Sequence, residues 1–597
     1  MGPWKSQSEL LLDLFENVFA DLALKYPASS KSFARDFVTI CDRVTEEGVS
    51  FLTKTLPKLG KAFEQALETH LLSVPREFKR SHENRQIPAF LQGIVSRCFD
   101  VNGVLVECEP EVIRDIRQVL YLAYRIEFPY EEAVEAAVID NFIATDEELS
   151  VQHFDDDLVA IANCAVEECM REFDPKDIIP RHGPGAVATG ERGDDKWVFS
   201  RLYNRIHQKF PYYDYFVVGG GRELVDRIEW YRSLAREESG VAKVVLVPKD
   251  SRGPRLISCE PLEYQWIQQG IGRQLMRHLE RNYLTRGHIN FSDQSVNRSL
   301  ALTSSKSREW STIDLKDASD RVSTKLVNSL FPKELASCFM AARTTATRLP
   351  DGRVIDLNKF APMGSALCFP VEAVCFWAVA VAAIVRDGSL PIRHAAQQVY
   401  VYGDDIIVPS IYMHSVIRAL ESFSLKVNTL KSFRDGFFRE SCGVDAYFGE
   451  DITPVKVRTL WTAKPSDGSA YASYVSYANS FGHLGYRCVS AYLWARIEEV
   501  YGKVPYGTPQ SSYPCRQINS GFGALLKNIQ LGFRLRFDAG YQVVQIKSSF
   551  LKAKEDNSYL GGWPRLLKHL VMPSEHDPSK VVLPRRTQFK RGWRRMV

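Results

Sequence analysis

The sequence predicts an α+β protein, because a long helical region is followed by short strand-like runs separated by turns. Residues 1 to about 175 place apolar side chains at helical spacing, for example in the stretch 11–22. Farther along, short runs rich in β-branched or aromatic residues lie at 244–247, 310–313 and 399–408, next to glycine, proline or aspartate. Long helices and short strands in one chain are typical of this class.

Length and composition indicate an ordinary globular protein of several packed units. The chain has 597 residues, of which 45% are hydrophobic and 25% charged, and a net charge of +4. The longest apolar run, 373–385, is too short to span a membrane and is predicted to be a buried helix closed off by Glu372 and Arg386. With so small a net charge, contacts to nucleic acid would have to come from local basic patches.

The cysteines favour a reducing compartment. Twelve are scattered along the chain without a Cys-x-x-Cys pair or a His-Cys group. This distribution argues against a zinc site and against a disulfide framework. A cytoplasmic location fits it best.

A basic hairpin is expected around residue 250. Strand-like runs flank a turn with three cations within seven residues, Lys249, Arg252 and Arg255. A planar guanidinium and a point-charge ammonium both suit triphosphate oxygens. The alternative is a solvated hairpin tip with no ligand.

A strand ending in acids follows at 310–320. Asp314 comes directly after the apolar Ile313, where the strand would end, and Asp320 precedes a predicted helix. Asp320 alone is explained by a helix N-cap. If this strand lies beside the run at 399–408, Asp314 reaches the same point as the acids there.

Those acids form the tripeptide Gly403-Asp404-Asp405, at the tip of a predicted β-hairpin. Turn chemistry explains a Gly-Asp pair, but two adjacent carboxylates repel each other unless a cation lies between them. Hard divalent cations take such oxygen ligands, so a metal site is the hypothesis. A second copy, 193–195, lies among charged residues and is interpreted as a solvated loop.

Three weaker signals accompany this hairpin. Gly364-Ser365 forms a small-residue loop before a long apolar helix, which lets a ligand approach or serves as a structural loop. Lys431 follows the hairpin. The last 17 residues carry six cations and no acid, and are either an RNA contact or a disordered tail, namely Arg585, Arg586, Lys590, Arg591, Arg594 and Arg595.

In this order the motifs resemble the palm motifs of RNA-dependent RNA polymerases. Over about residues 240–460 the detailed match resembles the replicase subunit of positive-strand RNA bacteriophages, the leviviruses of the Qβ type. The segments that carry the resemblance are 247–249, 293–297, 314–320, 363–364, 402–407, 428–431 and 438–443.

The resemblance implies a right-hand fold with a ferredoxin-like antiparallel palm sheet. Residues 1–175 would form a helical region bridging fingers and thumb. Residues 176–300 would form fingers with the basic hairpin, 301–460 the palm, and 461–597 the thumb and basic tail.

The resemblance also implies roles for single residues. Asp314, Asp404 and, less directly, Asp405 would hold two Mg²⁺ ions, with Mn²⁺ or Ca²⁺ as substitutes. Lys431 would protonate the leaving pyrophosphate. The basic hairpin (Lys249, Arg252, Arg255) would hold the incoming triphosphate, and the ribose 2′-hydroxyl would be checked by Asp320 and Ser365 beside Gly364. Ser365-Ala366 departs from the Asn-Gly of the Qβ replicase, which weakens the ribose assignment.

The implied function is RNA-directed RNA synthesis without a primer, in the cytoplasm of a bacterial host and with no membrane. Partners would be RNA template and product, ribonucleoside triphosphates, and by similarity host elongation factors Tu and Ts and a ribosomal RNA-binding protein. The alternatives are a reverse transcriptase, which usually has Tyr-x-Asp-Asp and an aromatic ribose gate, and a non-catalytic RNA-binding protein. Gly403 and the lack of an aromatic residue between Asp314 and Asp320 favour RNA synthesis.

Overall fold

The computed structural model describes residues 3–219, 221–572 and 580–596, and confirms the α+β class. Two large hydrophobic cores organise most of it. One lies between residues 158 and 427, with Leu567 added from the C-terminal region. The other joins residues 10–126 to residues 433–504, so the first helices of the chain pack against a late segment.

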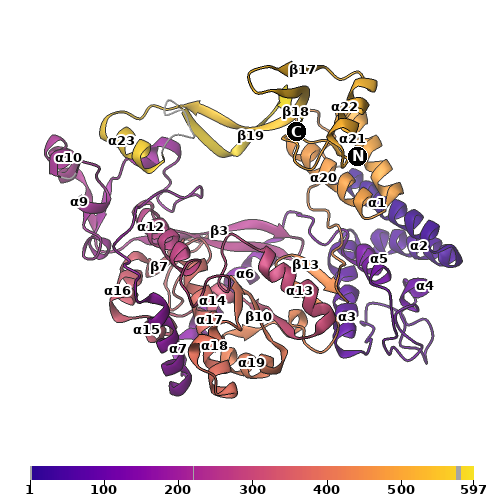
Figure 1. Ribbon diagram of the computed structural model, residues 1–597, viewed down its shortest axis with the longest axis horizontal. Helices are drawn as coiled ribbons and strands as arrows, with labels where there is room; N and C mark the ends of the chain where they lie inside the picture. Colours follow the sequence, from indigo (N-terminus) through magenta and orange to yellow (C-terminus); the bar gives the residue numbers. More distant parts are fainter. Residues whose placement is uncertain (1–2, 220, 573–579, 597) are drawn as a thin grey trace.

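The second of these cores, built from the N-terminal helices, lies on one side of the molecule (Figure 1). Amphipathic helices turn their apolar faces to one another there. They are α1 (Pro3–Lys25), α2 (Ser30–Glu47), α3 (Leu56–Thr69), α4 (Gln92–Val95), α5 (Pro110–Tyr121), α20 (Gly468–His483) and α21 (Arg487–Tyr501).

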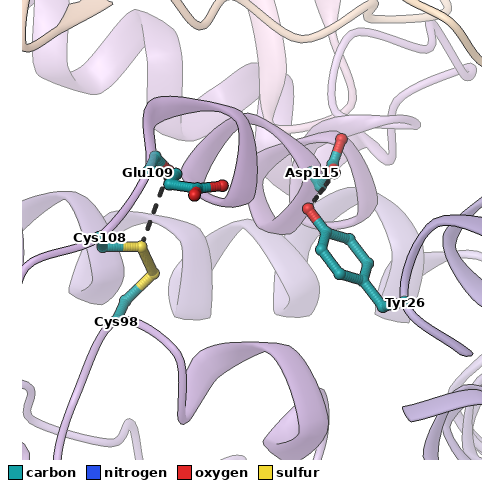
Figure 2. Close-up of a disulfide and its surroundings, with 5 residues drawn as sticks. All are labelled: Tyr26, Cys98, Cys108, Glu109 and Asp115. Carbon is teal, nitrogen blue, oxygen red and sulfur yellow. Dashed lines mark hydrogen bonds between the residues drawn. A yellow bond between two sulfur atoms is a disulfide. The ribbon is translucent and has the colours of Figure 1, made fainter. Parts of the chain in front are cut away.

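Cys98 and Cys108 form a disulfide in this region (Figure 2), a single pair that the argument against a disulfide framework did not foresee. A tight turn brings them together, since Gly103 N donates to Asp100 O and Val106 N to Cys98 O. Their spacing matches no recognisable pattern, so the sequence did not reveal the pair. The other ten cysteines, all within the described residues, form no disulfide.

A three-stranded antiparallel sheet lies at the centre of the other core. Its strand order is β5 (Trp310–Ile313), β10 (Asp405–Pro409), β9 (Tyr400–Tyr402), with Ile313 opposite Ile406. The 310–313 run therefore lies beside the 399–408 run, which was the condition for Asp314 to reach the acids there. Around the sheet pack α7 (Asp156–Met170), α12 (Leu262–Leu279), α13 (Ser295–Ser307), α14 (Ala318–Arg321), α15 (Thr324–Leu330), α16 (Lys333–Ala342), α18 (Ile392–Ala396) and α19 (Met413–Ser422).

The apolar run at 373–385 is part of helix α17 (Cys368–Gly388), whose side chains are almost all buried. Of the described helices, α17 alone is long and apolar enough to cross a membrane, and its burial is that of a core helix. Glu372 and Arg386 lie within the helix and do not bound it, contrary to expectation. The buried carboxyl group of Glu372 is tolerated in this helix because its Oε2 accepts a hydrogen bond from the Cys368 thiol, 3.6 Å away.

The basic hairpin is confirmed as a hairpin, β3 (Val241–Asp250) with β4 (Gly253–Cys259). It extends into a sheet of order β4-β3-β7-β8, through β7 (Ala346–Arg348) and β8 (Val354–Asp356). Helix α6 (Glu132–Glu148) packs on β4, so the N-terminal third of the chain touches this sheet directly.

Two strand pairs and a further three-stranded sheet form between residues 201 and 451. They are β1 (Arg201–Tyr203) with β2 (Ala235–Glu237), β6 (Leu315–Lys316) with β11 (Lys426–Val427), and β12 (Phe438–Ser441) with β13 (Val444–Tyr447) and β14 (Glu450–Asp451). Short helices fill the region before β3, namely α8 (Asn204–His207), α9 (Tyr212–Tyr215), α10 (Gly221–Asp226) and α11 (Ile228–Ser233).

The basic C-terminal segment is a strand, so the alternative of a disordered tail is wrong for 580–595. β19 (Lys580–Arg595) pairs with β18 (Val543–Asn557), which pairs with β17 (Leu535–Asp538), with Asp538 opposite Val543 at the turn. This long hairpin runs from the α20 side of the molecule to α23 (Gly562–Val571) (Figure 1). The side chains of Arg585 and Arg586 lie outside the described residues. Beside it lie β15 (Tyr506–Gly507), β16 (Arg516–Gln517) and α22 (Gly521–Gln530).

Candidate active site

The Gly403-Asp404-Asp405 turn closes the β9–β10 hairpin, with Tyr402 paired to Asp405 across it. Gly403 has φ +62°, and a Cβ there would lie 2.4 Å from Cε2 of Phe369 on α17. Both observations exclude a larger residue. Asp404 is exposed at the tip, and Asp405 is half-buried.

Asp314 lies beside this turn because β5 pairs with β10 and Asp314 directly follows the last residue of β5. The three carboxylates influence one another electrostatically. Burial, followed by the charge of Asp404, raises the pKa of Asp405 to about 7. Burial also raises the pKa of Asp314, while Lys431 and a hydrogen bond from Asn428 oppose that rise. The structure therefore brings together the acids that the sequence placed at two strand ends.

The segment 428–433 runs along the end of β5 and supplies most of the partners of Asp314. Asn428 Nδ2 donates to Asp314 Oδ2 at 2.7 Å, and the Asp314 backbone N–H donates to Ser432 Oγ at 3.2 Å. Lys431 Nζ lies 4.0 Å from Asp314 Oδ1 and 3.4 Å from Glu440 Oε1. The Glu440 carboxylate is the main cause of a raised Lys431 pKa.

Asp405 is held differently from Asp404. Its Oδ2 accepts the backbone N–H of Cys442 at 3.1 Å, in the turn between β12 and β13. Asn297 Nδ2 on α13 approaches its backbone carbonyl at 3.4 Å. The side chain of Asp405 is thus tied to the neighbouring hairpin, whereas Asp404 remains exposed beside Asp314.

The basic hairpin carries the three predicted cations, but one is already paired. Arg252 forms a two-point ion pair with Asp250, at 3.0 and 2.6 Å. Burial lowers the pKa of Lys249, and the charges of Arg255, Arg252 and Lys431 lower it further. The ammonium groups of Lys249 and Lys431 are therefore close enough to repel each other, and an anion bound between them would relieve this repulsion.

The loop before α17 is fixed against β4. Gly364 has φ +122°, and a Cβ would lie 2.2 Å from the carbonyl oxygen of Ser258, whose N–H donates to Met363 O at 2.8 Å. The Ser365 hydroxyl donates to Gln268 Oε1 on α12 at 3.1 Å and is buried. The Ser365 hydroxyl is therefore directed into the protein.

Asp320, the other predicted ribose contact, lies in α14 beside a buried lysine. Its Oδ1 is 3.5 Å from Lys359 Nζ. Burial raises the pKa of Asp320 and Lys359 counters that effect. The interpretation of Asp320 as a helix N-cap is wrong, because Asp320 lies within α14 and the N-cap of the next helix, α15, is Ser323.

The chemistry of the donor set fits a hard divalent cation. Asp314, Asp404 and Asp405 offer carboxylate oxygens that repel each other without one. As placed, however, no three His, Cys, Asp or Glu side chains within the described ranges are grouped closely enough to hold a metal ion. For all three acids to take part in binding a metal ion, the Asp405 carboxylate would have to give up its hydrogen bond from the Cys442 N–H, or assist only through the adjacent Asp404.

The sequence assigned no role to several residues that the site contains. Asn428, Glu440, Cys442 and Asn297 all lie within the segments quoted for the resemblance, which was the signal available. The second tripeptide copy is also not a solvated loop. Asp194 accepts hydrogen bonds from Ser558 Oγ at 2.7 Å and Lys568 Nζ at 2.9 Å, so it ties η4 (Gly193–Trp197) to α23 and the segment before it.

This site matches a known class of protein. Residues 225–466, which include all four of Asp314, Asp404, Asp405 and Lys431, match the family model for RNA replicase, beta-chain. The resemblance to the leviviral replicases is thereby confirmed over this segment.

Individual relatives agree. The RNA-directed RNA polymerase subunit beta of Qbeta virus (strain MX1) is 37% identical over 225 residues, 38% of this chain and 36% of that protein. The corresponding subunit of Enterobacteria phage SP is 37% identical over 216 residues, 36% of each chain. The beta chain of Escherichia phage MS2 is 35% identical over 215 residues, 36% of this chain and 37% of that one. The match thus spans little more than a third of these relatives.

Solved structures resemble the chain only weakly. The RNA-dependent RNA polymerase of bacteriophage phi12 covers 75% of this chain and 76% of its own, with 11% identity and a TM-score of 0.37. The insertion loop deletion mutant of the RNA-dependent RNA polymerase of a human picobirnavirus covers 77% of this chain and 84% of its own, with 12% identity and a TM-score of 0.36. These values are too low to assign parts of the fold.

Proposed function

We propose that this chain is an RNA-directed RNA polymerase of the leviviral type that copies a positive-strand RNA phage genome, starting without a primer. The observation that carries the proposal is the meeting of Asp314 with Asp404 at adjacent strand ends, beside Lys431. The similarity over residues 225–466 supports it.

Asp314 and Asp404, with Asp405 as a helper, would hold two Mg²⁺ ions, for which Mn²⁺ or Ca²⁺ could substitute. Bound there, the ions would lower the pKa of the growing 3′-hydroxyl and neutralise the leaving pyrophosphate. Asn428 would keep one oxygen of Asp314 oriented, because its amide donates to that carboxylate.

The basic hairpin would bind the incoming triphosphate. Lys249 and Arg255 would do so directly, and Arg252 after exchanging Asp250 for phosphate oxygens. Tyr130 supports the tip from the N-terminal region, since its hydroxyl accepts from Lys249 N at 3.1 Å and donates to Asp250 O at 2.9 Å. Lys431 would protonate the leaving pyrophosphate.

Ribose selection would fall to Asp320 and to the Gly364-Ser365 loop. Ser365 bonds Gln268, so its hydroxyl would contact a ribose only after leaving that partner. The fixed backbone of Gly364 would set the distance between the loop and the nucleotide.

The proposed domains, the RNA contact and the protein partners also follow from the resemblance to the leviviral replicases. Residues 1–175, 176–300, 301–460 and 461–597 would correspond to the bridging region, fingers, palm and thumb. The β18–β19 hairpin would contact RNA through its basic side chains. Host elongation factors Tu and Ts and a ribosomal RNA-binding protein would join the enzyme in the bacterial cytoplasm.

Incorporation on an RNA template separates this function from its rivals. The full chain, purified from a bacterial host with whatever co-elutes, should incorporate ribonucleotides and not deoxyribonucleotides, with no primer added. Preference for deoxyribonucleotides would indicate a reverse transcriptase. RNA binding without incorporation would indicate the non-catalytic alternative.

A further inference from the structure

Among the described residues, Glu440 is the acid nearest to the Lys431 ammonium, and the proposed polymerase mechanism gives it no role. Glu440 Oε1 lies 3.4 Å from Lys431 Nζ, closer than the 4.0 Å that separates this ammonium from Asp314 Oδ1. Its other oxygen, Oε2, is buried and has no hydrogen-bond partner. The carboxylate of Glu440 is therefore directed at the lysine, and its second oxygen is bonded to no other group among the described residues.

The strand that carries Glu440, β12, is fixed to β5, the strand that ends directly before Asp314. The neighbouring Arg439 is fully buried, and its guanidinium donates to the carbonyl oxygens of Trp310 on β5, at 2.9 Å, and of Gly436 and Phe438. β12 therefore cannot shift relative to β5 without breaking several hydrogen bonds.

The N-terminal helices also fix the β12–β13 hairpin. Arg117 on α5 pairs with Asp445 on β13 at 2.7 Å and with Glu64 on α3 at 2.8 Å. Lys61, the other cation near Glu440, is occupied by Glu64 at 2.6 Å. Glu440 is thus left to bind Lys431.

Lys431 needs such a partner because its flexible side chain can adopt many rotamers. The cations and ionisable groups that face it are Lys249, Lys61 and Tyr124, and the acids are Asp314 and Glu440. Repulsion from Lys249 and Lys61 would move the ammonium away from the triphosphate site, whereas Glu440 holds it there.

We propose that Glu440 is a positioning residue that holds the Lys431 ammonium between Asp314 and the basic hairpin, facing the leaving pyrophosphate. The inference rests on the proposed polymerase function. Glu440 itself takes no proton and touches no substrate; it fixes where the Lys431 side chain lies.

The kinetic test compares Glu440→Gln, Glu440→Asp and Lys431→Ala, singly and with Glu440→Gln added to Lys431→Ala. Glu440→Gln should lower kcat about 10- to 100-fold with little change in KM for nucleotide, because a misplaced catalytic group costs that much. Glu440→Asp, which keeps the charge, should recover part of the loss. In the Lys431→Ala background, Glu440→Gln should cost nothing further.

Glu450→Gln is the matched control, since Glu450 is an exposed acid on β14 of the same sheet. It should leave kcat unchanged. Equal activity of Glu440→Gln and this control, or losses that multiply in the double variant, would overturn the positioning role.

A second measurement does not depend on catalysis. Acetylation of lysines, followed by mass spectrometry, should show Lys431 several-fold more reactive in Glu440→Gln than in the wild type, with exposed Lys426 unchanged. Unchanged Lys431 reactivity would overturn the inference even in an active polymerase. Raised reactivity in a chain that incorporates no nucleotide would instead contradict the proposed function alone.

Discussion

Gly403 and Phe369 lie in such close contact that a single added methyl group could not fit between them. The Cβ of an alanine at 403 would be 2.4 Å from Phe369 Cε2, and the backbone has φ +62°. The helix after the 364–365 loop thus sets the position of the turn that carries Asp404. This contact couples the packing of α17 to the geometry of the candidate site.

Gly403→Ala should therefore cost both stability and activity. A positive φ alone costs an alanine about 1 kcal/mol, and the clash adds to that by displacing the turn or the ring. Thermal unfolding and nucleotide incorporation would measure the two effects.

Gly352→Ala is the control, because Gly352 also has a positive φ, +94°, but nothing lies within 4 Å of its added Cβ. It should show only the backbone cost. Equal effects of the two variants would mean that the Phe369 contact does not matter. Phe369→Leu should partly restore Gly403→Ala.

Arg117 is predicted to be a main support of the contact between the N-terminal helices and the β12–β13 hairpin. Replacing this buried guanidinium by methionine leaves Glu64 and Asp445 without their shared partner, and such a change typically costs about 3–5 kcal/mol. The urea midpoint should fall accordingly. Lys58→Met, which removes the exposed pair with Glu77, should leave it almost unchanged. A similar small effect for both would show that the buried network is not stabilising.

Glu263 should make the stability of the protein depend on pH. It is buried on α12, and burial raises its pKa from 4.5 to about 7. Between these values the folded protein binds more protons at this site than the unfolded chain, so the contribution is fully present below pH 4.5 and is lost as pH rises through 7. Glu263→Gln stays neutral, and its melting temperature relative to the wild type should rise from pH 5 to pH 8.

Exposed Glu46 provides the comparison for that experiment. Glu46→Gln should show no such trend over the same range. A Glu263→Gln difference that stays constant with pH would contradict the raised pKa.

Local patterns were enough to predict the strands, whereas the approach of Asp314 to Asp404 followed only if the two strands lay side by side, as the resemblance to the replicases implied. Two runs of β-branched and aromatic residues on either side of a glycine-containing turn define a hairpin within a dozen residues, and a strand's last residue is readable from its neighbours. The basic hairpin was predictable for the same reason. Its internal Asp250–Arg252 pair was also adjacent in sequence, yet it was interpreted only as part of a cation cluster.

Contacts between distant segments could not be predicted. The bond from Ser365 to Gln268 and the pairing of Arg117 with Asp445 join residues 97 and 328 positions apart, and no periodicity in the sequence encodes them. The N-terminal region was therefore expected to bridge fingers and thumb, with no single residue given a role. In the structure Tyr130, in the loop before α6, supports the basic hairpin, and Arg117 on α5 supports the hairpin that bears Glu440.

The proposed polymerase site depends on the carboxylates of the 403–405 turn. The second Gly-Asp-Asp of the chain, at 193–195, provides a control. Asp404→Asn and Asp195→Asn change the middle acid of one Gly-Asp-Asp and the exposed last acid of the other. Both variants should fold like the wild type by circular dichroism. On an RNA template, Asp404→Asn should lose ribonucleotide incorporation by at least about 100-fold, whereas Asp195→Asn should retain it. Full activity of a folded Asp404→Asn variant would contradict the proposed polymerase site.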